Sequence, residues 1–156
     1  MRSFEGIAAL LKIGNRITVT LYINALAAAQ KLDGAISDAL DTIEQALEFN
    51  PTELIHRPET FRLRGELRLE QGRAERAEGD FREAIALART MGAKFYELRA
   101  TMSLARLLAS QSRRDEARTM LAEIYGWFTE GFDTLDLKDA QALLDELNGA
   151  APRVGK

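Results

Sequence analysis

Small and large apolar residues recur along this chain at steps of four and three, a spacing that places them on one face of a helix. The clearest cases are three triplets, Ala39/Ile43/Ala46, Ala77/Phe81/Ala84 and Ala117/Leu121/Ile124. Their first alanines stand 38 and 40 residues apart, and the turn residues Gly34, Gly72 and Ser112 keep the same register. The pattern predicts a repeat of helix pairs.

The breaks in this pattern predict where each helix begins and ends. Helices are expected over 3–13, from 17 to the turn at 33–34, from that turn to 49, from 58 to Gly72, and over 73–91, 94–110, 113–125 and 137–147. The run ITVTLYI alternates like a strand, but it continues into helix-favouring LAAAQKL and the repeat requires a helix there. Ser112 with Asp115 is expected to cap the helix from 113.

The expected organisation is one domain over 1–156, with an all-α right-handed superhelix of three helix pairs. The parts in order are a lone helix (1–14), three repeats (15–56, 57–93 and 94–131), a cap helix (132–149) and a tail (150–156). Leu137, Ala140, Leu144 and Leu147 give the cap helix one apolar face, as the end of a stacked array requires. The lone first helix suggests that the chain is the tail of something longer.

The order of small residues and turns resembles the tetratricopeptide repeat (TPR), although Arg64 and Arg68 stand where that pattern prefers a leucine and an aromatic residue. The runs PETFRLRGEL, FYELRATMSLARLLASQSRRDEAR and YGWFTEGFDTLDLKDAQALLDEL also resemble the C-terminal TPR region of bacterial multidomain nucleotide cyclase and STAND-type ATPase signalling proteins. In that group the enzymatic domains lie upstream of the repeats. The resemblance therefore implies a scaffold or sensor tail rather than a catalytic unit.

Charge and composition narrow the function further. The formal net charge is -3, but the segment 57–118 holds fourteen Lys/Arg and ten Asp/Glu. The arginines alternate with glutamates at helical spacing, which favours an ion-paired surface over a nucleic-acid site. The absence of cysteine favours a reducing compartment, and no apolar run is long enough to span a bilayer. A cytoplasmic protein that binds neither nucleic acid nor membrane is expected.

The sequence contains few of the residues and motifs that catalytic sites use. There is no glycine-rich phosphate loop, no cysteine, and one histidine, His56, which is expected in a surface linker. We therefore expect no enzyme, no cofactor and no metal site. The aromatic residues Trp127, Phe128 and Phe132 beside Tyr125 suggest either a ligand cage or, as the favoured interpretation, filler between the third helix pair and the cap helix.

The remaining candidate site is the concave face that TPR arrays use, lined by the first helix of each pair. Counting in register places these residues on it: Leu21, Asn24 and Ala28, then Glu59, Arg62 and Glu66, then Arg99, Met102 and Arg106. Met102 is equally consistent with core filler. If Arg62, Arg99 and Arg106 share one surface, we expect unpaired positive charge there that attracts an acidic and apolar peptide.

These observations are consistent with three functions. The first is a protein-interaction module that binds a peptide or a domain, including one of a parent protein. The second is a homodimer formed through the apolar face of the first helix, Ile7, Leu10 and Leu11. The third is a small-ligand sensor, which requires an enclosed pocket among the helices.

Overall fold

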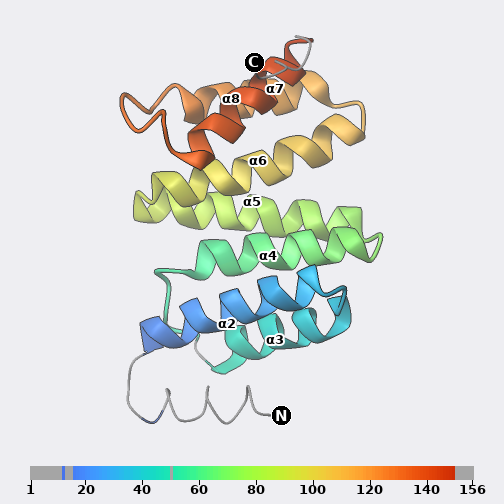
Figure 1. Cartoon of the computed structure of the whole chain (residues 1–156), viewed down its shortest axis with the longest axis vertical. Helices are drawn as coiled ribbons and strands as arrows, with labels where there is room; N and C mark the ends of the chain where they lie inside the picture. The colour runs from blue at the N-terminus through green and yellow to red at the C-terminus, as the bar shows by residue number, and fades with distance from the viewer. Residues whose placement is uncertain (1–11, 13–15, 50, 150–156) are drawn as a thin grey trace. The chain divides into compact units, whose positions relative to one another are not determined.

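The computed structural model describes residues 12, 16–49 and 51–149, whose regular secondary structure is helical with no strand (Figure 1). The helices are α2 (Arg16–Leu32), α3 (Ile36–Phe49), α4 (Arg57–Glu70), α5 (Ala74–Met91), α6 (Lys94–Ser110), α7 (Arg114–Tyr125) and α8 (Leu135–Leu147). The all-α prediction is confirmed for this part of the chain. The expected helix over 3–13 and the self-association residues Ile7, Leu10 and Leu11 lie outside the described residues.

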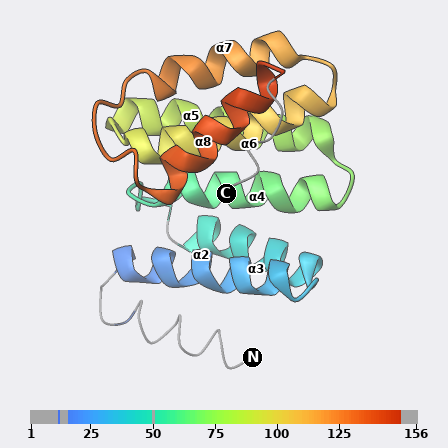
Figure 2. The ribbon, with the colours of Figure 1, turned by 45° about the horizontal axis from the view of Figure 1, so that its top comes forward.

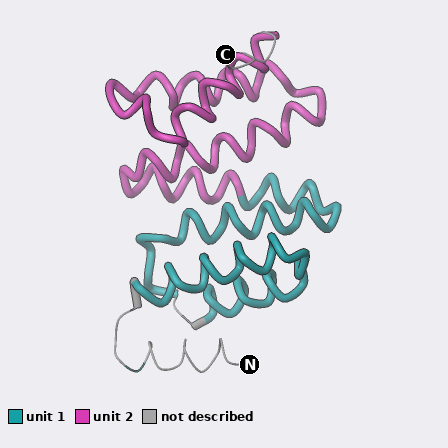
Figure 3. Tube along the Cα trace, in the orientation of Figure 1, with its two compact units in different colours: residues 1–80 teal, residues 81–156 magenta. Residues whose placement is uncertain are grey.

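The chain divides into two compact units, Met1–Asp80 (unit 1) and Phe81–Lys156 (unit 2), which Figure 3 shows in teal and magenta. The boundary falls inside α5. It does not coincide with any of the repeat boundaries expected from the sequence, and those boundaries stay a prediction.

In unit 1, helices α2 and α3 pack against each other and α4 packs against both. The sequence gives each helix a buried face, and these faces meet in two apolar clusters. They are formed by Ala27, Ala39, Ile43, Leu63 and Leu67, and by Val19, Ile23 and Ala46. Pro58 lies in the first turn of α4 as expected, where its missing N–H removes no helical hydrogen bond.

In unit 2, α6 and α7 form a pair, and α8 packs against both of them (Figure 2). The end of α8 is held by Arg114 of α7. Its Nε donates to the carbonyl of Leu147 at 2.9 Å, and its Nη2 donates to the carbonyl of Glu146. These bonds satisfy two of the carbonyls that the last turn of a helix leaves without partners.

The turns that follow α2, α4 and α6 have the same geometry. Gly34, Gly72 and Ser112 have φ of 79°, 73° and 63°. In each turn this residue's N–H bonds the carbonyl three residues back, and the next N–H bonds the carbonyl five residues back, which is the Schellman motif. The expected N-cap role of Ser112 is wrong, because Arg113 is the N-cap and no side chain caps the helix.

The helical predictions agree closely with the structure. All nine residues of the three triplets are buried, and the ITVTLYI stretch is helical from its first residue. The helix expected over 94–110 has those limits, and α8 begins two residues before its expected start at 137. Burial of one face outweighs the strand-like local sequence in α2, since a helix in this place covers Ala39 and Ile43 of α3.

Candidate binding pocket

A pocket of about 890 Å³ lies in unit 2, where the turn before α6 meets the segment that joins α7 to α8. Eight residues line it: Gly92, Lys94, Phe95, Trp127, Phe128, Thr129, Glu130 and Gly131. Gly92 and Gly131 have positive φ, which ends α5 and turns the chain after Glu130. Both chain segments that form the pocket are therefore fixed by glycine turns.

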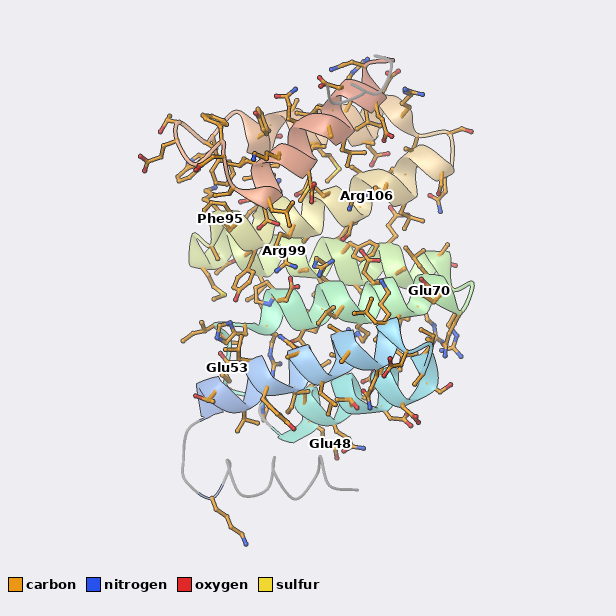
Figure 4. The ribbon with its side chains drawn as sticks, in the orientation of Figure 1. Glu48, Glu53, Glu70, Phe95, Arg99 and Arg106 are labelled. Carbon is orange, nitrogen blue, oxygen red and sulfur yellow. The ribbon has the colours of Figure 1, made fainter. Side chains whose placement is uncertain are left out.

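Three aromatic rings give the pocket an apolar surface. Phe128 is buried, and its ring centroid lies 5.0 Å from that of Phe95 and 5.3 Å from that of Trp127, the latter edge-on at 88°. Phe95 and Trp127 are 45% and 57% exposed; Figure 4 labels Phe95 at the start of α6. Phe128 thus anchors two rings that present accessible apolar area to solvent.

A cluster of charges adjoins these rings. The Nζ atom of Lys94 lies 3.2 Å from Oε2 of Glu97 and 5.3 Å from the centroid of Trp127, within cation–π range. The other oxygen of Glu97 lies 2.7 Å from Nε of Arg89 on α5. The Glu97 side chain is only 5% exposed, so two cations are needed near it to offset the cost of burying its charge.

The aromatic residues near the cap helix divide between the two interpretations that the sequence left open. Phe128 is buried, as the favoured core interpretation required. That interpretation is wrong for Trp127 and for Phe132, which is 46% exposed and packs beside Tyr125 at 5.9 Å. Trp127 is held at the surface because its ring rests edge-on against Phe128 and under the Lys94 ammonium.

Of the candidate groove residues in unit 1, Asn24 is buried and Ala28 is partly buried. The Asn24 side-chain oxygen accepts a hydrogen bond from Thr60 Oγ1 at 2.8 Å, so it joins α2 to α4. A buried, paired amide adds no contact area to an open surface, which removes Asn24 from the candidate set.

The second candidate row in unit 1 is a short ion-pair chain along α4. Arg62 Nη2 lies 2.7 Å from Glu59 Oε1, and Arg62 Nη1 lies 3.4 Å from Glu66 Oε1. Lys31 of α2 lies 3.5 Å from the other oxygen of Glu66. The expected unpaired charge at Arg62 is therefore wrong, because its neighbours on the same helix face compensate it.

The third candidate row lies along α6 in unit 2, where Figure 4 labels Arg99 and Arg106. Nε of Arg99 lies 3.8 Å from Oδ1 of Asp136 on α8, so its charge is also compensated, and Arg106 is exposed. Met102 is buried, which settles its two interpretations in favour of the core. Of the three residues in this row, Arg106 is the exposed one, as a groove-lining residue has to be.

Sequence reasoning missed a buried ion cluster in unit 1. Asp80 is 3% exposed, and its two oxygens accept hydrogen bonds from Arg64 Nε at 2.9 Å and Arg68 Nη1 at 2.7 Å. Glu44 of α3 lies 3.7 and 3.5 Å from the two guanidinium groups. The signal was present, since Arg64 and Arg68 depart from the TPR pattern at a helical spacing of four, where they can hold one carboxylate.

Within the described ranges, no group of three His, Asp or Glu side chains is placed to hold a metal ion, and none of the helices is both long and apolar enough to cross a bilayer. A scan against protein-family models gave no match, and a search of the curated proteins gave none either.

Proposed function

We propose that this chain is a protein-interaction module made of TPR-like helix pairs in a right-handed superhelix, and that its aromatic pocket docks a peptide segment of a partner protein. The recurring turns at Gly34, Gly72 and Ser112 and the buried triplets support the repeat class. Membership of a bacterial signalling protein is part of the same proposal and rests on the resemblance of the sequence.

The observation that carries this proposal is the exposure of Phe95 and Trp127 around a buried Phe128. Large aromatic rings in contact with water are costly, and clusters of them mark protein-binding surfaces, where they act as anchors. The volume of about 890 Å³ accommodates a few side chains of an extended segment. A docked apolar side chain would remove both rings from water.

A small-ligand sensor is the second candidate, because the same volume lies in the range of small-molecule sites. The two functions differ in the ligand that a selection recovers. A peptide module yields binders from a library of displayed peptides, whereas a small-molecule sensor yields none and responds to metabolite mixtures.

The test combines peptide selection with the natural fluorescence of Trp127, the one tryptophan of the chain. Peptides without tryptophan are selected on the whole chain, synthesised, and titrated while Trp127 emission is followed. We expect Phe95→Ala to weaken binding about tenfold, as loss of an anchoring aromatic does. Phe132→Ala is the matched control, since this ring is 46% exposed in the same unit but does not line the pocket.

Two results would overturn the proposal. One is a selection that recovers no peptide able to change Trp127 emission. The other is equal weakening by Phe95→Ala and Phe132→Ala, because the binding surface would then lie outside the aromatic pocket.

A further inference from the structure

We infer that the segment bound in the aromatic pocket carries a carboxylate side chain next to a large apolar one. This inference rests on the proposed function and adds the chemistry of the partner. The apolar side chain lies on Phe95 and Trp127, and the carboxylate lies at Lys94. The reasons are the charge balance around Glu97, the position of the Lys94 ammonium over Trp127, and the separation of Lys94 from Glu130 in the pocket lining.

The first reason is an excess of positive charge at one side of the pocket. Glu97 is buried and places one oxygen near Arg89 and the other near Lys94, so one negative charge serves two cations. The Lys94 side chain lines the pocket and is 29% exposed. An ammonium group has three N–H donors and can therefore hold Glu97 and a ligand carboxylate together.

The second reason is that a cationic ligand would meet a site already filled by a cation. The Lys94 ammonium already lies over the Trp127 ring, 5.3 Å from its centroid, where a ligand ammonium would otherwise bind. Two like charges at one ring repel each other. A carboxylate at the same place is attracted instead.

The pocket also has a direction. Of its eight lining residues only Lys94 and Glu130 carry charge, and they lie on different chain segments, α6 and the segment between α7 and α8. The acidic group of the ligand is therefore placed toward Lys94 and away from Glu130. Removing the Lys94 charge must therefore lower the affinity for an acidic segment, and removing the Glu130 charge must raise it.

The experiment uses three synthetic peptides with the same apolar centre, two leucines, and with blocked ends so that no terminal charge contributes. The flanking residues are aspartate in the first, asparagine in the second and lysine in the third. Each is titrated into the whole chain while Trp127 emission is recorded, and then into Lys94→Met and Glu130→Gln. The asparagine peptide checks in each variant that the apolar part of the pocket is intact.

We expect the aspartate peptide to bind about tenfold more tightly than the asparagine peptide, and the lysine peptide to bind more weakly than both. Lys94→Met should remove that tenfold advantage, and the asparagine peptide measures in the same variant how far the apolar part of the pocket has changed. Glu130→Gln should strengthen the aspartate peptide about twofold to threefold, as loss of one repulsive exposed charge does. Added salt should reduce the advantage.

The inference is overturned if the lysine peptide binds best, or if Lys94→Met leaves the preference for aspartate intact. Equal binding of all three peptides, with loss in Phe95→Ala, overturns the inference but leaves the proposed function standing. If no peptide changes Trp127 emission, including those recovered by selection, the proposed function itself fails.

Discussion

Among the described residues, each unit holds a buried carboxylate between two cations, and the two arrangements differ in how exposed the cations are. In unit 1, Asp80 is held by Arg64 and Arg68, whose side chains are only 14% and 18% exposed. In unit 2, Glu97 is held by Arg89 and Lys94, whose side chains are 50% and 29% exposed.

The difference lies in what surrounds the cations. In unit 1 a second acid, Glu44, lies near both guanidinium groups, and Arg64 also rests over the ring of Phe61 at 5.1 Å. In unit 2 the ammonium of Lys94 lines a pocket with two exposed rings. A buried carboxylate between two cations is thus enclosed in unit 1, where it joins helices, and open in unit 2, where one of the cations reaches the pocket.

The largest expected effect comes from removing each buried carboxylate. Asp80→Ala should lower the free energy of unfolding by about 3–5 kcal/mol, because it leaves two poorly hydrated guanidinium groups with only the half-exposed Glu44 as a counter-ion. Glu97→Ala should cost about 1–3 kcal/mol, since water can reach Arg89 and Lys94. Urea unfolding followed by circular dichroism measures both.

Glu44→Ala, at a half-exposed position, is the control and should cost less than about 1 kcal/mol. An equal loss for Asp80→Ala and Glu97→Ala would erase the distinction.

Overpacking should affect both units alike. Ala39→Phe in unit 1 and Ala117→Phe in unit 2 place a ring at fully buried positions of equivalent triplets, and each should destabilise by about 1–3 kcal/mol. Ala122→Phe, on the exposed side of α7, is the control and should stay within about 0.5 kcal/mol. Thermal unfolding checks all three variants. A tolerated ring at Ala39 or Ala117 would contradict the common register of the triplets.

Exchanging serine and glycine in two equivalent turns should change the free energy of unfolding in opposite directions. Ser112 has φ of 63°, which favours glycine, so Ser112→Gly should stabilise by about 0.5–1 kcal/mol. Gly72→Ser places a side chain at φ of 73° in the equivalent turn and should destabilise by about 1 kcal/mol. Ser112→Ala removes the hydroxyl but keeps the Cβ atom, so it should have little effect if backbone conformation alone matters. The prediction fails if both turn variants shift the unfolding midpoint in the same direction.

The smallest effect concerns pH and Glu116 in unit 2. A hydrogen bond from Arg82, supported by Arg113, lowers the pKa of Glu116 below its usual value. Because the folded-state pKa is depressed, the stabilisation is present above the unfolded value near about 4.3 and is lost as pH falls through the folded value. Glu116→Gln should remove this contribution and make stability less dependent on pH in that range. Matching pH profiles for variant and wild type would contradict it.

The sequence predicted those features of the fold that depend on residues close together in the chain. Helix limits were readable because glycine at positive φ, proline in a first turn and the spacing of buried alanines act over a few residues. The repeated turn geometry at Gly34, Gly72 and Ser112 had the same origin. Even the strand-like ITVTLYI stretch was read as a helix, since the repeat register constrained it.

The sequence by itself determined that the described chain is helical and which face of α3, α5 and α7 is buried, because side-chain periodicity fixes both. Only the tertiary structure decided which charges meet. It paired Arg64 and Arg68 with Asp80, and Arg62 with its neighbours on α4, and it left the Lys94 ammonium beside an exposed Trp127. Ion pairs and pockets depend on distances between helices, which periodicity along one helix does not contain.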